Sequence, residues 1–288
     1  MAVMRRDLEK AKDYAERHGV PMATDRAEDL LENDEIDAIY IATPPDSHMA
    51  YALKVAAAGK ICCIEKPLTP TLAEGQKIIA AFAEKNLPLF VAYYRRNLPR
   101  FLKVKQFLDE GRIGTVRHLQ WTYCCPDKTG EAYDWRCDKK IARGGLFDDL
   151  ASHGLDLFGF LLGDYVDVKG VGLNQQGAYT AMDAVTSCWT HQNGVTGMGT
   201  WNFGSALYVD RVEIHGDKGC ISFSVFANLP MRLTTPEREE VYHIPHPDPV
   251  QKYHVQAMAD QLFREVPHAS TGETALHTAW VMEQMIAG

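Results

Sequence analysis

The segment Ile36–Pro70 constrains the fold of this 288-residue chain more than any other part of the sequence. It holds two short apolar runs, 37–41 and 61–64, with a helical pattern over 49–58 between them. Nearly continuous apolar strands that are joined by one helix are typical of a parallel βαβ unit, whose sheet is buried on both faces. We therefore expect a parallel sheet at the start of the chain.

Polar residues and prolines follow both of these predicted strands. Thr43-Pro44-Pro45 comes after the first strand, and Glu65-Lys66-Pro67 comes after the second. In open α/β sheets, ligands bind beyond the carboxyl ends of the strands. Both tripeptides are therefore candidate site residues.

The pattern of strands and helices changes after residues 87–92. Up to that point strands alternate with helices, whereas consecutive strand-like runs follow between 115–123 and 231–235. We predict an α/β plus α+β fold class. An incomplete, Rossmann-like parallel sheet domain is expected over 1–95, and an α+β domain with an open, mainly antiparallel sheet is expected over 96–288. The last helix is expected to pack back on the first domain.

A second group of polar residues lies in a predicted helix over 146–162. Asp149 and His153 are four residues apart, so they share one face of the helix. A carboxylate near an imidazole can fix its tautomer and raise its basicity. Gly144-Gly145 just before the helix allows close backbone approach. Taken alone, such a pair is more often an ordinary surface pair.

These motifs together resemble the Gfo/Idh/MocA oxidoreductases, which are NAD(P)-dependent enzymes that act mostly on sugars and cyclitols. The motifs that carry the resemblance are Ala42-Thr43-Pro44 with His48, Gly59-Lys60, Glu65-Lys66-Pro67 and the Asp149/His153 pair. The resemblance extends over almost the whole chain. It implies that Lys66 and His153 are the catalytic pair and that Asp149 supports both catalysis and substrate binding.

The resemblance and the strand ends together give two sets of expected contacts. The residues expected at the cofactor are Arg5, Arg6, Thr43, Pro44, His48, Glu65 and Lys66. The residues expected at a polyhydroxy substrate are Tyr94, Arg96, Trp135, Arg136, Asp149 and His153. A structural role stays open for His48, and ordinary packing stays open for the residues at 94–96 and 135–136.

The start of the chain bears on the choice of cofactor. Arg5-Arg6 stands where an acidic residue would bind the ribose hydroxyls of NAD, and arginine there suits a 2′-phosphate. We therefore expect NADP to be preferred and NAD to be possible, with two solvated helix-start charges as the alternative.

The sequence contains no G-x-G-x-x-G turn. By resemblance, the family's first strand and glycine turn precede Met1, so we expect a truncated Rossmann sheet and impaired activity.

Composition excludes several classes of protein. The net charge of −8 argues against nucleic-acid binding, and no apolar run reaches the roughly 20 residues of a membrane span. Seven cysteines without a disulfide framework and no signal peptide indicate reduced thiols and a cytoplasmic location. Cys124, Cys125 and Cys137 lack the spacing of a zinc site, and we expect no metal. By resemblance, the C-terminal sheet is expected to form a homodimer or a higher homo-oligomer.

Three functions remain open on the sequence. The first is hydride transfer between a nicotinamide cofactor and a sugar, cyclitol or dihydrodiol. The second is a catalytically silent binding or scaffold protein, and the third is a glycosidase that uses tightly bound NAD. The presence of Lys66, Asp149 and His153 favours catalysis, whereas the absent glycine turn favours the silent protein.

Overall fold

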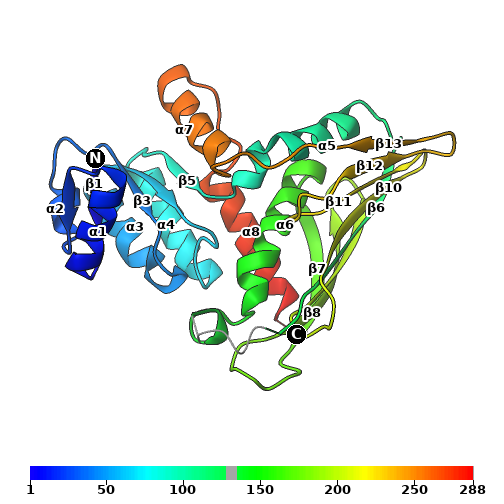
Figure 1. Cartoon of the computed structure of the whole chain (residues 1–288), viewed down its shortest axis with the longest axis horizontal. Coiled ribbons are helices and arrows are strands. Elements are labelled where there is room, and N and C mark those ends of the chain that lie inside the picture. The colour runs from blue at the N-terminus through cyan, green and yellow to red at the C-terminus, as the bar shows by residue number, and fades with distance from the viewer. Residues whose placement is uncertain (128–134, 288) are drawn as a thin grey trace.

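The computed structural model describes residues 1–127 and 135–287. Figure 1 shows a smaller N-terminal part and a larger C-terminal part with long strands. In chain order the elements are β1 (Ala2–Met4), α1 (Leu8–His18), β2 (Met22–Thr24), α2 (Glu28–Leu31), β3 (Ala38–Ile41), η1 (Pro45–Ser47), α3 (His48–Ala57), β4 (Ile61–Ile64), α4 (Leu72–Glu84), β5 (Leu89–Val91), η2 (Tyr94–Asn97), α5 (Pro99–Asp109), β6 (Val116–Cys124), η3 (Trp135–Cys137), α6 (Leu146–Leu162), β7 (Tyr165–Leu173), β8 (Ala184–His191), β9 (Thr196–Asn202), β10 (Val209–Gly216), β11 (Cys220–Phe223), β12 (Met231–Thr234), β13 (Glu239–Tyr242), α7 (Lys252–Arg264) and α8 (Gly272–Met285).

The N-terminal part is built from parallel strands with helices between them. β3, β4 and β5 form one parallel sheet in sequence order, and β1 pairs with β2 in a separate parallel pair. Asp7 caps α1 by accepting a hydrogen bond from the amide of Lys10, and Gly19 ends the helix at a φ of 62°. The Rossmann-like parallel architecture expected from the sequence is confirmed.

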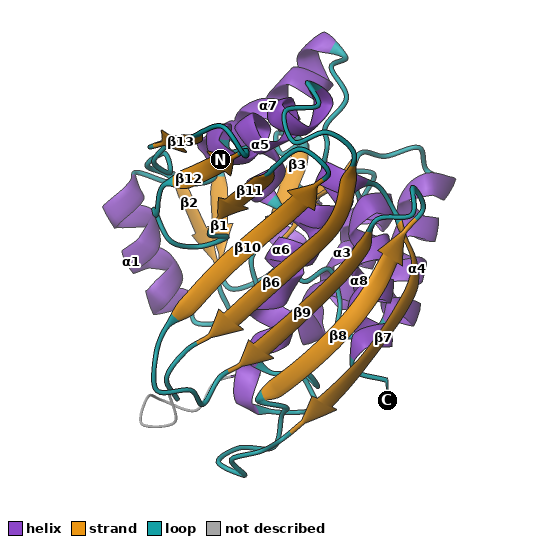
Figure 2. Ribbon diagram, turned by 90° about the vertical axis from the view of Figure 1, so that its right-hand side faces the viewer, coloured by secondary structure: helices purple, strands orange, loops and turns teal. Residues whose placement is uncertain are grey.

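The C-terminal part is an eight-stranded sheet in the order β13-β12-β11-β10-β6-β9-β8-β7. Among the strand pairs described for this sheet, only β6 and β9 are parallel, so the sheet is mainly antiparallel, as expected. Figure 2 shows its outer face turned toward the viewer, with the helices behind it. The inner face packs on α6, where Gly154 lies against the indole of Trp121. A Cβ at residue 154 would come within 2.3 Å of that ring, so only glycine allows α6 to pack this closely.

The outer face of the large sheet exposes several apolar side chains. Val171, Leu173 and Met198 are each about half exposed on β7 and β9. The expectation that a second copy of the chain covers this sheet stays a prediction.

The last helix connects the two parts. α8 packs against both α4 and α6. Just before it, the hydroxyl of Ser270 donates to the carbonyl of Val91 over 2.7 Å, at the end of β5. The segment around Ser270 and α8 thus joins the carboxyl end of β5 to α6 of the C-terminal part. The candidate site lies between these elements.

One strand was missed by the sequence analysis. β13 carries Glu239 and Glu240 at the edge of the large sheet, where charged side chains block pairing with another chain. Such an edge strand lacks the apolar alternation that identifies buried strands.

Among the helices that the structure describes, none combines the length and the apolar character that a bilayer span requires.

Candidate active site

Lys66 brings a positive charge to the carboxyl end of β4. The strand before it is buried, and the Lys66 side chain is only 12% exposed. Its ammonium forms an ion pair with the carboxylate of Asp149 and donates to the backbone carbonyl of the same residue over 3.0 Å. A lysine from the parallel sheet thus meets an aspartate from α6, although 83 residues separate them in sequence.

Asp149 is held between two cations. Its second carboxylate oxygen accepts a hydrogen bond from Nε of Arg136 over 2.6 Å. Burial alone raises the pKa of this carboxyl, but the charges and hydrogen bonds of Lys66 and Arg136 outweigh burial and lower the pKa below its ordinary value. Asp149 is therefore ionised at neutral pH and keeps the Lys66 side chain in a defined position.

His153 lies one helical turn beyond Asp149 but has a different partner. Nη1 of Arg95 lies 3.1 Å from Nδ1 of His153. Because a guanidinium only donates hydrogen bonds, Nδ1 accepts this one, and the neutral ring carries its hydrogen on Nε2. Burial, followed by the charges of Arg95 and Lys66, lowers the pKa of His153 well below its ordinary value.

This geometry corrects one expectation from the sequence. Within residues 1–127 and 135–287, no hydrogen bond or ion pair joins Asp149 to His153. The expectation that the carboxylate fixes the tautomer of the imidazole and raises its basicity is wrong. The carboxylate of Asp149 binds Lys66 and Arg136 instead, and the hydrogen bond from Arg95 fixes the tautomer of His153.

Arg95 is the residue that the sequence analysis overlooked. It is buried, donates to the carbonyl of Val225 over 3.1 Å, and lies over the rings of Tyr94 and Phe226. The ring of Tyr94, one of the predicted residues, also lies 5.3 Å from the imidazole of His153. The available signal was the Tyr94-Arg95-Arg96 run itself, in which the sequence analysis chose the second arginine.

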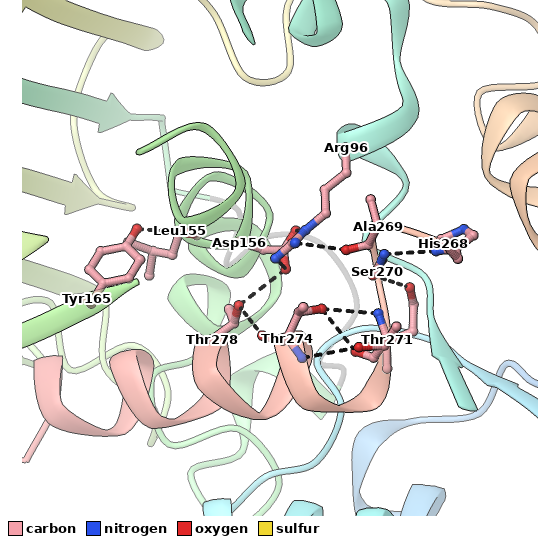
Figure 3. Close-up of polar contacts among 11 residues, drawn as sticks. Arg96, Leu155, Asp156, Tyr165, His268, Ala269, Ser270, Thr271, Thr274 and Thr278 are labelled. Carbon is pink, nitrogen blue, oxygen red and sulfur yellow. Dashed lines mark hydrogen bonds and ion pairs between the residues drawn. The ribbon is translucent and has the colours of Figure 1, made fainter. Parts of the chain in front are cut away.

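Arg96 points into the protein. Its guanidinium forms two 2.7 Å hydrogen bonds with the carboxylate of Asp156 and a third bond, of 2.9 Å, with the carbonyl of Ala269. Figure 3 shows this pair beside the hydroxyl of Thr278 on α8. These contacts favour the packing role that the sequence left open for Arg96 over contact with a substrate.

A small hollow lies next to Lys66 and holds a carboxyl that the sequence analysis did not consider. The side chains of Pro45, Pro67, Thr69 and Trp135 line it together with Asp148. The pKa of Asp148 is raised to about 7, mainly by burial and in addition by the charge of Asp149. The hydrogen bond that the amide of Gly144 donates to the carboxylate over 2.9 Å acts in the opposite direction. Asp148 therefore changes its charge close to neutral pH.

The residues predicted at the cofactor lie in four different settings. His48 is fully buried and bridges two carbonyls, those of Leu68 and Thr43, which favours the structural role left open for it. Glu65 accepts hydrogen bonds from Tyr40 and Gln251. Arg5 and Arg6 are exposed and follow β1 directly, and β1 pairs with β2 apart from the sheet of β3, β4 and β5. Thr43 and Pro44 lie at the end of β3, next to the hollow-lining Pro45.

Comparison with known proteins gives this arrangement a family. The model of the oxidoreductase family with an NAD-binding Rossmann fold matches residues 1–93, and the model of the GFO/IDH/MocA C-terminal domain matches residues 101–222. A curated oxidoreductase of Formosa agariphila is 36% identical over 256 residues, which is 88% of this chain and 79% of that protein. The chain belongs to the Gfo/Idh/MocA family of oxidoreductases.

Two further matches are to proteins named levoglucosan dehydrogenase. The levoglucosan dehydrogenase of Pseudarthrobacter phenanthrenivorans is 28% identical over 243 residues, which is 75% of this chain and 62% of that enzyme. A solved levoglucosan dehydrogenase in complex with NADH and levoglucosan matches with a TM-score of 0.88 at 22% identity, over 99% of this chain and 86% of that one. At this level of identity, the structural match shows the fold of the Gfo/Idh/MocA family.

The residues that line the hollow of this Gfo/Idh/MocA chain are of types that suit the nicotinamide end of the cofactor. Three prolines and Trp135 line the hollow and suit the face of an aromatic ring, and Asp148 is a polar partner for a carboxamide. Three of the lining residues, Pro67, Trp135 and Asp148, are the chain neighbours of Lys66, Arg136 and Asp149, which are joined by hydrogen bonds and ion pairs. Since the sequence contains no G-x-G-x-x-G turn, this fit concerns the nicotinamide end alone.

Proposed function

We propose that the chain transfers hydride between a nicotinamide cofactor and a hydroxyl-bearing carbon of a sugar, cyclitol or dihydrodiol. The observation that carries the proposal is the ion pair of Lys66 and Asp149, with His153 one helical turn away on α6. Pro67 and Asp148, the chain neighbours of the pair, line a hollow together with Trp135. The similarity to a relative named levoglucosan dehydrogenase supports a sugar-like substrate.

The proposed roles follow from the hydrogen-bonding capacity of each side chain. Nζ of Lys66 holds the proton that a substrate carbonyl oxygen takes up on reduction, and the amine takes that proton back on oxidation. Nε2–H of His153 donates to the same oxygen, because Arg95 occupies Nδ1. Asp149 and Arg136 hold the lysine in place. When bound, the cofactor supplies the hydride chemistry.

We further propose that NADP is preferred over NAD. Arg5 and Arg6 are exposed where β1 ends, and Arg5 lies over the ring of Tyr14 at 5.7 Å. Guanidinium groups at this strand end suit a 2′-phosphate better than two ribose hydroxyls.

A substrate survey tests the proposed reaction. The purified chain is incubated with excess NADP or NAD and a panel of sugars, cyclitols and dihydrodiols, and the absorbance of the reduced nicotinamide is followed. The proposal expects turnover with at least one polyhydroxy compound. Lys77→Met removes an exposed lysine from α4 and should leave that rate unchanged. If no compound of the panel is oxidised at saturating cofactor, and none of the corresponding ketones is reduced, the proposal is wrong.

A further inference from the structure

Three side chains of types that can bind a metal ion, a glutamate, a histidine and a cysteine, lie close together on the outer face of the large sheet. Glu213 and His215 lie two residues apart on β10, so they point to the same side of the sheet. Cys220 on β11 pairs directly with His215 across the two strands. One ligand atom from each of the three lies within 4.8 Å of the others, and all three side chains are half-buried. Within the described part of the chain, no other set of His, Cys, Asp and Glu meets this condition.

The neighbouring residues hold this cluster in position. Gln120 on β6 and Arg211 on β10 each donate to the carboxylate of Glu213 over 2.5 Å. The ring of His118 stacks on that of His215, with the centroids 6.4 Å apart, and is itself bound to Thr196. Partners of this kind orient the ligands of metal sites.

We propose that Glu213, His215 and Cys220 bind Zn²⁺, with water as the fourth ligand. A carboxylate oxygen, an imidazole nitrogen and a thiolate are the ligand types that Zn²⁺ takes in proteins, whereas Ca²⁺ and Mg²⁺ require oxygen ligands. With zinc–ligand bonds of about 2.0–2.3 Å, the ligand atoms of a tetrahedral site lie roughly 3.2–3.8 Å apart. The three ligand atoms lie within 4.8 Å of one another in the structure, and small side-chain rotations are enough to bring them into this range.

The sequence alone did not show this site, because its ligands are brought together by strand register. The turn at 217–219 joins β10 to β11 and places residue 215 opposite residue 220. The spacing E-x-H-x₄-C matches no common zinc motif, and the expectation of no metal was drawn from Cys124, Cys125 and Cys137 instead. The outer face lies opposite α6, which carries Asp149 and His153, so the zinc site is independent of the proposed reaction. Its expected effect is to stabilise the β10–β11 hairpin.

Zinc titration of the chelator-treated chain tests the proposal. Competition against a chromophoric chelator should show one Zn²⁺ per chain with a Kd on the order of micromolar or tighter. Loss of an orienting partner alone costs about 10–100-fold in metal affinity, so Cys220→Ser and His215→Ala should each weaken binding at least about 100-fold. Cys188→Ser removes an exposed thiol of the same sheet from β8 and should leave the affinity unchanged.

Two further readouts separate a zinc site from a folding defect. Co²⁺ bound to the wild-type chain should show the near-ultraviolet charge-transfer band of a thiolate ligand, and Cys220→Ser should abolish it. Zn²⁺ should raise the Tm of the wild type but not that of Cys220→Ser, provided that the circular dichroism of the two apo chains agrees. The proposal is overturned if the wild type binds no Zn²⁺ in this range, or if Cys220→Ser and Cys188→Ser bind it equally well.

Discussion

The guanidinium of Arg95 donates a hydrogen bond to Nδ1 of His153 over 3.1 Å. This contact decides what the imidazole can do, since it leaves the hydrogen of the neutral ring on Nε2. Burial and the positive charges of Arg95 and Lys66 all oppose a second proton on the ring. In the reaction that we propose, His153 therefore donates a hydrogen bond to the substrate oxygen, and Lys66 exchanges the proton.

Replacing Arg95 with glutamine tests this assignment. Arg95→Gln keeps a donor for Nδ1 but removes the charge, so the pKa of His153 should rise toward its ordinary value. The wild-type ring should stay neutral at about pH 6, below the ordinary histidine pKa of about 6.5. Nitrogen-15 NMR of the imidazole reports both the charge and the tautomer across this range. A wild-type ring that is protonated at about pH 6, or that carries its hydrogen on Nδ1, would contradict the assignment.

The buried pair of Arg96 and Asp156 should matter for stability rather than for turnover. Asp156→Ala leaves a buried guanidinium without its counter-ion, which typically costs about 3–5 kcal/mol. Replacing both residues with Met and Leu should recover most of this loss in chemical denaturation. Glu9→Ala breaks the exposed pair with Lys12 and serves as the control with little expected effect. An Asp156→Ala chain as stable as the wild type would show that the pair contributes nothing.

Asp148 should make stability depend on pH. Its pKa is about 7 in the folded chain against an ordinary value of 3.8, so the native state favours the protonated carboxyl. Stability from this group is fully present below about pH 4 and is lost as the pH rises through about 7. Asp148→Asn keeps an oxygen for the amide of Gly144 and has no charge to bury. Its Tm should exceed that of the wild type at about pH 8, and the difference should vanish at about pH 4.

The same substitution at an exposed site provides the control for this effect. Asp167→Asn on β7 should change Tm equally at both pH values. If Asp148→Asn behaves in the same way, Asp148 does not carry the pH dependence.

Arg5 should influence the choice between the two nicotinamide cofactors. Arg5→Asp replaces a partner of the 2′-phosphate with a group that accepts from ribose hydroxyls, so the ratio of NADPH to NADH affinity should fall by about tenfold or more. Fluorescence titrations with NADPH and NADH measure this ratio. Arg117→Asp makes the same charge change on β6 and should not alter it. Equal ratios for Arg5→Asp and the wild type would remove the argument for NADP.

The sequence predicted elements and local patterns better than partners. The βαβ unit was visible because its strands and helix are contiguous, and the spacing of Asp149 and His153 placed both on one face of α6. The spacing of residues within one helix or strand does not show which residues of other elements will contact them in the folded chain. Arg95 reaches His153 from 58 residues away, and Cys220 meets His215 through strand register.

Burial was equally hidden in the sequence. Arg96 looked like a substrate residue because it follows a strand end, but the structure buries it against Asp156. Asp148 looked like a neighbour of Asp149, and only its burial in the folded chain moves its pKa to about 7. A residue type and its spacing specify candidates, whereas tertiary packing decides which of them face a ligand.

The catalytic roles of Lys66 and His153 are tested most directly by comparing kcat at saturating cofactor for the wild type, Lys66→Met and His153→Ala. The account predicts that each substitution lowers kcat by about 10²–10⁴-fold, the usual contribution of a group that exchanges or donates a proton. The Kd of the cofactor, measured by fluorescence, should change little, because both residues act on the substrate oxygen. If both variants keep a kcat close to that of the wild type, the proposed reaction centre is contradicted.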